Sequence, residues 1–99
     1  HLLSPPVPNL VRDARWGRVE ETYGEDVFLT SRMAVAAARA FRDRGIVTST
    51  KHFVANYSDG GRDSAPVYFS ERDLREYWLA PFEAAIVEGG SLGVMPAYN

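Results

Sequence analysis

The sequence predicts an α/β fold of about three parallel strands and two helices, spread over residues 1–99 as part of a single domain. Two observations lead to this prediction. Two helical segments with clear start and stop signals alternate with three short apolar segments of strand length. The strand segments begin roughly forty residues apart with a helix closing each gap, which is typical of right-handed βαβ units and a parallel sheet.

The first expected strand is PVPNLV at residues 6–11, although its prolines weaken it because proline cannot donate to a strand ladder. The first helix is expected from about residue 25 to residue 44. Glu25 and Asp26 suit its positive amino end, and Gly45 suits the position just past its last turn. Its buried face is expected to carry five apolar residues at helical spacing, namely Leu29, Met33, Ala37, Ala40 and Phe41.

The second strand is expected at residues 45–50, GIVTST, where β-branched side chains gather. The second helix begins after Ser70, because a serine followed three positions later by Asp73 is the arrangement of an amino-terminal cap, and it ends at the glycine pair 89–90. The third strand is expected within SLGVMPAY at residues 91–98. The expected buried face of the second helix consists of Leu74, Trp78, Phe82, Ala85 and Ile86.

An isolated sheet of three parallel strands would leave two edges with unpaired backbone groups. A (β/α)8 barrel has no such edges and needs about 250 residues, so three βα units would fill just under half of it. The chain also begins at His1 and stops at Asn99, in an apparently unfinished segment. We therefore expect residues 1–99 to be a fragment of one (β/α)8 barrel domain, completed by the remainder of a parent chain.

Composition excludes several function classes. Hydrophobic residues make up 45% and charged residues 24% of the chain, as in ordinary globular proteins, and the formal net charge of -2 offers no general attraction to nucleic acid or anionic lipid. There is no cysteine, and His1 and His52 lie far apart without zinc-like pairing. No apolar run approaches the roughly 18 residues of a membrane span. The sequence thus predicts no metal, nucleic-acid or membrane partner, and leaves the compartment open.

Candidate binding residues follow the ends of the expected strands. In a parallel sheet, functional groups lie in the loops after the carboxyl ends of the strands. The stretch RDARWGRVEETYGED at residues 12–26 follows the first strand, KHF at 51–53 follows the second, and Met95 and Tyr98 belong to the third. Arginine recurs at every third position from residue 12 to residue 18, which also fits one face of a solvated helix, but Gly17 and the strand-to-helix position favour a loop at the barrel rim.

Lys51 and His52 emerge side by side from a buried strand, where uncompensated charge is costly. In one interpretation they are satisfied internally, Lys51 by Glu20 or Glu21 and His52 by a backbone carbonyl. In the other they form a binding site with Arg18, whose planar guanidinium can grip a carboxylate or two vicinal hydroxyls. Glu21 is placed to hold Arg18 or Lys51 in one orientation.

The remaining large and charged side chains of residues 12–26 have supporting roles in this interpretation. Trp16 either fills the core or forms a wall toward a ligand. Arg12, Asp13 and Arg15 are expected to brace the loop.

Four ordered blocks cover nearly the whole chain and resemble one known family. They are RDARWGRVEETYGED, KHF followed by GGRDSAP, SERDLREYWLAPFEAA, and VMPAYN. In this order and spacing they closely resemble the N-terminal barrel of family 3 glycoside hydrolases, the group of β-glucosidases and β-xylosidases. The resemblance implies a retaining β-glycosidase that hydrolyses terminal β-D-glucosyl or xylosyl residues of oligosaccharides or glycosides, with no cofactor.

The resemblance also implies roles for particular residues. Family members use the counterparts of Arg18, Lys51 and His52 to hydrogen-bond hydroxyls of the sugar in the innermost subsite. The counterparts of Met95 and Tyr98 lie at the same pocket, the tyrosine near the nucleophile. In the family the nucleophilic aspartate follows a later strand and the acid/base is usually a glutamate in a second domain. No catalytic residue is therefore expected within this chain, which should be inactive by itself.

Two alternatives stay open at this point. A non-catalytic sugar-binding or interaction module would fold as a stable monomer, whereas a fragment with exposed sheet edges would associate. A β-N-acetylhexosaminidase of the same family would carry an acid/base histidine in the loop after KHF. The loop here, residues 54–69, contains no histidine, which favours a glucosidase or xylosidase. The sequence does not choose between glucose and xylose.

Overall fold

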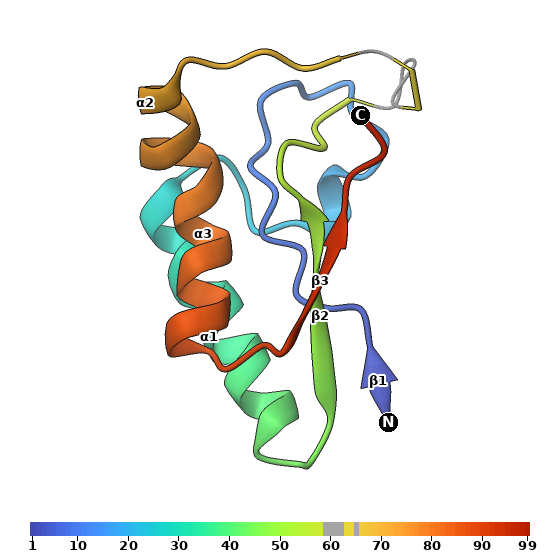
Figure 1. Ribbon diagram of the computed structural model, residues 1–99, viewed down its shortest axis with the longest axis vertical. Helices are drawn as coiled ribbons and strands as arrows, with labels where there is room; N and C mark the ends of the chain where they lie inside the picture. The colour runs from blue at the N-terminus through green and yellow to red at the C-terminus, as the bar shows by residue number, and fades with distance from the viewer. Residues whose placement is uncertain (59–62, 65) are drawn as a thin grey trace.

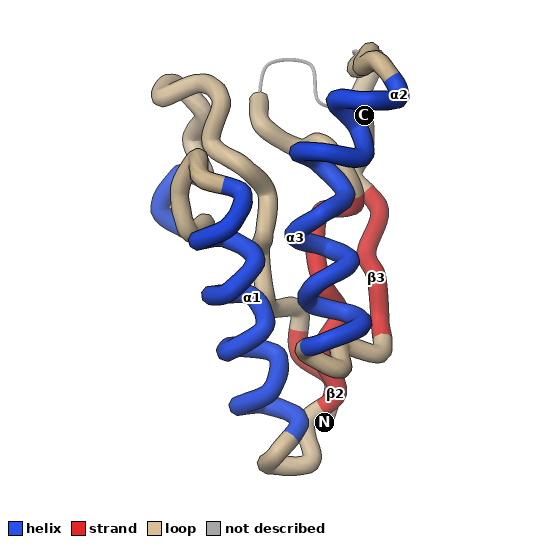
Figure 2. Tube along the Cα trace, turned by 90° about the vertical axis from the view of Figure 1, so that its left-hand side faces the viewer, coloured by secondary structure: helices blue, strands red, loops and turns tan. Residues whose placement is uncertain are grey.

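The computed structural model describes residues 1–58, 63–64 and 66–99. Its strands β1 (Leu2–Leu3), β2 (Val47–Phe53) and β3 (Gly93–Pro96) form a parallel sheet in the order β1-β2-β3. Figures 1 and 2 show the helices α1 and α3 running alongside each other on one side of these strands. The prediction of three parallel strands joined by two helical segments is confirmed.

The first strand is displaced from its predicted position. It comprises Leu2–Leu3, so the expectation of a strand at residues 6–11 is wrong. Pro6 and Pro8 have no amide hydrogen, so this segment cannot form a continuous ladder with β2. A single backbone hydrogen bond links the two, from the Lys51 amide to the Pro6 carbonyl at 3.1 Å. The segment is nevertheless buried along residues 6–10.

Strands β2 and β3 lie close to their predicted positions. The register pairs Ser49 with Gly93 and Lys51 with Met95. Buried hydroxyls also link the start of β3 to β2, because Ser91 Oγ lies 2.8 Å from the Oγ1 atom of Thr50 on that strand. The Ser91 contact fixes the start of β3 against β2, and the pairing of Lys51 with Met95 places the carboxyl ends of the two strands next to each other.

Helix α1 (Val27–Arg42) begins and ends at the signals that the sequence predicts. Asp26 caps it, since its Oδ1 accepts a hydrogen bond of 2.6 Å from an amide of the first turn. Gly45 follows the helix with φ of 71°, in the left-handed region. The Ile46 amide then donates to the Phe41 carbonyl at 3.1 Å, as in a Schellman ending.

The buried face of α1 is not the stripe that the sequence predicts. Leu29 and Met33 are 51% and 45% exposed. A close helix contact explains the difference, because a Cβ added at Gly89 of the second helical segment would lie only 2.8 Å from the Cβ of Ala38. Small side chains therefore fill this interface, and the larger apolar ones face outward. The buried residues of α1 are Thr30, Ala34, Val35 and Ala38.

The second helical segment begins after Ser70, whose hydroxyl accepts the Asp73 amide at 3.0 Å and caps it as predicted. The segment alternates α-helical and π-helical turns, a variation that its apolar spacing did not predict. Its parts are α2 (Glu71–Asp73), the π-helical η2 (Leu74–Leu79), α3 (Ala80–Glu83) and the π-helical η3 (Ala84–Glu88).

The face that this segment buries agrees largely with the prediction. Trp78, Phe82 and Ala85 are buried, whereas Leu74 is half-buried and Ile86 is 36% exposed.

An aromatic cluster connects this segment to the chain that follows β2. The ring of Trp78 lies 4.7 Å from that of Phe69 and 5.3 Å from that of Tyr57, measured between centroids. Trp78 also joins Leu10 and Ala55 in the buried centre of the hydrophobic core. The packing of these large apolar surfaces fixes the loops at the carboxyl ends of the strands.

Candidate functional site

The five residues that the sequence singles out for sugar contacts line one pocket. The pocket lies at the carboxyl ends of β2 and β3 and has a volume of about 180 Å³. Its walls come from three stretches of chain that are distant in sequence, which meet because parallel strands end at the same edge of a sheet. The lining residues are Arg18, Lys51, His52, Asn56, Met95 and Tyr98.

A short 3-10 turn, η1 (Val19–Glu21), positions the first of these side chains. Side chains three residues apart align in such a turn, so Glu21 faces Arg18. The Arg18 Nε donates to Glu21 Oε1 at 2.6 Å and Nη2 donates to Oε2 at 2.7 Å, which makes a bidentate pair. The Lys51 Nζ lies 3.7 Å from Glu21 Oε2. Glu21 therefore contacts both cations of the pocket.

The charge of Glu21 is stabilised by the same contacts. Hydrogen bonds from Arg18 lower the pKa of Glu21, burial opposes this effect, and the charges of Arg18, Lys51 and His52 lower the pKa further. The carboxylate is only partly shielded, with 35% of its side-chain surface exposed. Glu21 thus remains ionised at neutral pH and orients the two cationic groups.

His52 is buried behind Arg18. It is 5% exposed, and its Nε2 lies 3.1 Å from Arg18 Nη1. Guanidinium nitrogens can only donate, so Nε2 accepts and the proton of a neutral imidazole lies on Nδ1. The peptide bonds Lys51–His52 and Phe53–Val54 are cis. Neighbouring strand residues normally point to opposite faces, but Lys51 and His52 both line the pocket.

Asn9 holds the backbone of this segment, a role that the sequence pattern did not reveal. Its Oδ1 accepts the His52 amide at 2.8 Å, and its Nδ2 donates to the carbonyls of His52 at 3.0 Å and Val54 at 2.8 Å. Asn9 is 1% exposed. The available signal was an asparagine within an apolar run, since a buried amide must find partners.

The loop before η1 is braced by its own charges. Arg15 binds Asp13 through Nε at 2.9 Å and Nη2 at 2.7 Å, and these hydrogen bonds lower the pKa of Asp13 to about 2. The Arg12 guanidinium lies 5.2 Å from the ring centre of Tyr77, a cation–π distance. Trp16 is 3% exposed and is not among the pocket-lining residues, so it fills the core beneath the loop.

The pocket offers hydrogen-bond donors but no acid. Within the described part of the chain no carboxylate lines it, since Glu21 lies behind Arg18 and Lys51. Retaining glycosidases need two carboxyl groups about 5–5.5 Å apart at the reacting bond. The described side chains can therefore bind hydroxyls or an anionic group but do not form such a pair. Of the GGRDSAP block, residues 60–62 and 65 lie outside the described residues.

Neither a candidate metal site nor a candidate membrane span occurs among the described residues. They contain no group of three or more His, Cys, Asp or Glu side chains that could hold a metal ion. None of the helices that they form is long and apolar enough to cross a membrane.

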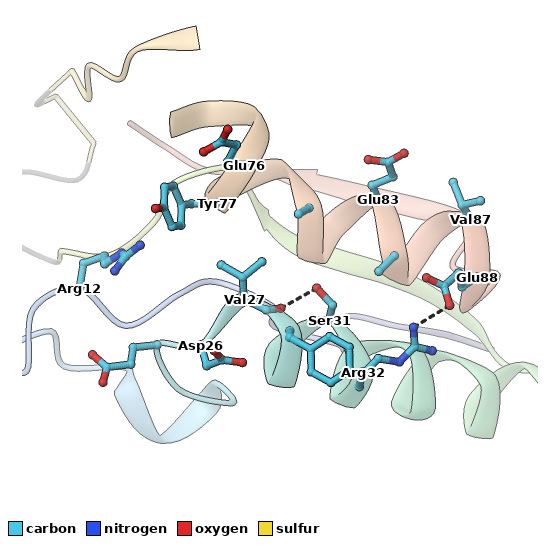
Figure 3. A pocket seen from close by; sticks show the side chains of 14 residues that line it. Arg12, Asp26, Val27, Ser31, Arg32, Glu76, Tyr77, Glu83, Val87 and Glu88 are labelled. Carbon is cyan, nitrogen blue, oxygen red and sulfur yellow. Dashed lines mark hydrogen bonds and ion pairs between the residues drawn. The ribbon is translucent and has the colours of Figure 1, made fainter. Parts of the chain in front are cut away.

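A larger hollow of about 790 Å³ lies between α1 and the second helical segment (Figure 3). Arg32 and Glu88 bridge the two helices across it, with Nη1 and Oε2 2.8 Å apart. Asp26 caps α1 at one end, and the Ser31 hydroxyl donates to a backbone carbonyl within α1 at 2.7 Å. The polar groups in these contacts therefore support the helices and their packing.

Comparison with known proteins gives concordant matches. Residues 2–99 match the model of the glycosyl hydrolase family 3 N terminal domain. The chain is 42% identical to a β-xylosidase from Formosa agariphila over 109 residues, covering 100% of this chain and 15% of that protein.

Two solved structures extend the comparison to three dimensions. A β-glucosidase from Kluyveromyces marxianus matches with a TM-score of 0.95 at 33% identity, covering 99% of this chain and 12% of that one. A mutant β-glucosidase from Listeria innocua, in complex with laminaribiose, matches with a TM-score of 0.88 at 34% identity, covering 100% and 15%. The chain thus spans between 12% and 15% of the lengths of these three relatives. The predicted partial (β/α)8 barrel is confirmed.

Proposed function

The chain belongs to glycosyl hydrolase family 3, and from this membership we propose that it forms part of the barrel domain of a retaining β-glycosidase. The proposed substrates are oligosaccharides or glycosides with a terminal β-D-glucosyl or xylosyl residue. Relatives named β-xylosidase and β-glucosidase support both sugars, and laminaribiose in the Listeria innocua structure supports a β-linked glucose substrate.

One observation carries this proposal, the convergence of Arg18, Lys51 and His52 on a single pocket. The Arg18 guanidinium donates hydrogen bonds in a planar fork and the Lys51 ammonium donates three that can rotate, which together suit the hydroxyls of one sugar ring. The volume of about 180 Å³ is smaller than the roughly 300–1,000 Å³ of a complete ligand site. The pocket therefore forms one part of the proposed innermost subsite, with Met95 and Tyr98 among its lining residues.

The reacting carboxylates belong elsewhere in this proposal. A nucleophile attacks the anomeric carbon and a second carboxyl group serves as acid and then as base. We assign neither role to this chain, because no described carboxylate lines the pocket. Arg18 and Lys51 would favour the ionised form of a nearby nucleophile, since opposite charges lower the pKa of a carboxyl group.

The test is hydrolysis of aryl β-glucoside and aryl β-xyloside by the full-length protein and, separately, by residues 1–99. We expect turnover by the full-length protein and none by the shorter chain. Turnover by residues 1–99 alone would refute our placement of the reacting groups. A full-length protein that binds glucose but hydrolyses neither substrate would instead be a non-catalytic sugar-binding module.

A further inference from the structure

Asn56 is a buried polar residue at the pocket that no part of the proposed function uses. It follows β2 by three positions and is 3% exposed. It lines the pocket together with Lys51 and His52. Its side chain is therefore held in place by the fold while one part of it remains open to a ligand.

The side-chain amide of Asn56 makes no hydrogen bond within the described part of the chain, although it is almost completely buried. Its oxygen and nitrogen are nevertheless not sealed from solvent. In this they differ from Thr30 Oγ1, which is unpaired and has no solvent contact. The amide thus reaches the pocket space. Asn9 provides the contrast, because its equally buried amide makes three hydrogen bonds to backbone groups.

A buried amide without a partner lowers stability, and the large majority of buried polar groups in proteins are paired. Such a group is expected where a ligand supplies the missing partner, since binding sites often reduce stability. The pocket is also poor in acceptors, the Tyr98 hydroxyl being one. Arg18 and Lys51 can only donate, and His52 Nε2 already accepts from Arg18. The Asn56 Oδ1 can accept from a hydroxyl while Nδ2 donates.

We propose that Asn56 is a sugar-binding and specificity-determining residue of this pocket, whose amide hydrogen-bonds a hydroxyl of the bound monosaccharide. The inference rests on the proposed function and extends it to a residue outside the set that the sequence singled out. A sugar that lacks the hydroxyl contacted by Asn56 leaves the amide without its partner. Asn56 therefore discriminates among monosaccharides. Arg18 and Lys51 discriminate less well, because each has several N–H groups and can donate to more than one hydroxyl.

The experiment uses the full-length protein with Asn56→Leu. This substitution removes the carbonyl oxygen and the NH2 group of the side-chain amide at similar volume. Thr30→Val is the matched control, because Thr30 Oγ1 is buried and unpaired within α1, and Thr30 does not line the pocket. Glucose and its single-deoxy derivatives serve as probes, with binding measured by calorimetry. Thermal melting of each variant reports stability.

For Asn56→Leu we expect glucose binding about tenfold weaker, with an unchanged or raised melting temperature. Thr30→Val should keep the glucose affinity. One deoxyglucose should bind the wild type about tenfold more weakly than glucose but bind Asn56→Leu as well as glucose does, which would identify the hydroxyl. Equal glucose affinity in Asn56→Leu and the wild type would overturn the inference, and so would a lower melting temperature that accounts for all of the lost binding. If the wild type neither binds glucose nor hydrolyses the aryl glycosides, the proposed function itself fails.

Discussion

Replacement of Asn9 by leucine should loosen the attachment of residues 51–54 to the chain segment at residues 6–11. The variant removes three hydrogen bonds and leaves the His52 amide and the carbonyls of His52 and Val54 without that partner. Each buried, unsatisfied backbone group costs about 1–3 kcal/mol. With three groups affected, and Val54 only partly buried, we expect a loss of about 3–5 kcal/mol, a large fraction of the stability of a typical domain.

The assay combines thermal melting of the full-length protein with hydrogen–deuterium exchange of the peptide that contains residues 51–58. Leu10→Ala is the matched control. Leu10 is the next residue and is 1% exposed, so its truncation should also cost about 2–5 kcal/mol, but through lost core packing. Exchange within residues 51–58 should accelerate more in Asn9→Leu than in Leu10→Ala at equal loss of stability.

The same pair of variants distinguishes an effect on the position of His52 in the proposed sugar site from an effect on the stability of the whole fold. We expect Asn9→Leu to weaken glucose binding more than Leu10→Ala does. The hydrogen bonds of Asn9 to the backbone of His52, which we call the Asn9 clamp, determine where His52 lies. If the two variants show the same exchange in residues 51–58 and the same glucose affinity, the clamp has no specific effect on the pocket and the reasoning is refuted.

Four further predictions concern the loop and the helices. Glu21→Gln should raise the KM for an aryl β-glucoside roughly threefold to tenfold, because Arg18 loses its bidentate carboxylate; an unchanged KM would show that Arg18 needs no such support. The pKa of Glu21 is lower in the folded protein than in the unfolded chain. The contribution of its ion pair with Arg18 to stability is therefore complete above the ordinary pKa of about 4.3 and disappears as pH falls through the lowered pKa. The ratio of substrate affinity between the wild type and Glu21→Gln should therefore be the same at pH 5 as at pH 7, and a ratio that already shrinks at pH 5 would contradict the lowered pKa. Gly89→Ala should lower stability by about 1–3 kcal/mol in thermal melts, because the new methyl group would overlap the Ala85 carbonyl of its own segment and lie 2.8 Å from the Ala38 Cβ of α1, and a neutral effect would mean that both contacts relax freely. Asp26→Ala should cost about 1 kcal/mol while Asp26→Ser retains the cap, and equal melting of the two variants would argue against capping.

Helix boundaries were predictable because their signals act over a few residues. Asp26, Gly45 and Ser70 satisfy backbone groups within one turn of their own positions, so the sequence around them contains all of the interacting partners. The strand at residues 6–11 was predicted wrongly because its apolar composition indicated burial, which is correct, whereas its prolines prevented the ladder.

The buried face of α1 could not be predicted by apolar spacing. Leu29 and Met33 have the expected helical separation, but the second helical segment approaches α1 too closely for large side chains. Ala34 and Ala38 are buried instead. Which face a helix buries depends on the distance to its neighbour, a quantity that a local pattern does not contain.

The sequence by itself determined the class of fold, the family, and five of the six residues that line the pocket, because each depends on residue types in a fixed order along the chain. Only the tertiary structure decided how these residues are supported. The Asn9 clamp on His52 spans 43 positions, and the opening of the Asn56 amide into the pocket depends on which groups surround it in space. Hydrogen bonds require partners within about 3 Å in a defined direction, and only the packed chain sets such distances between residues so far apart in sequence.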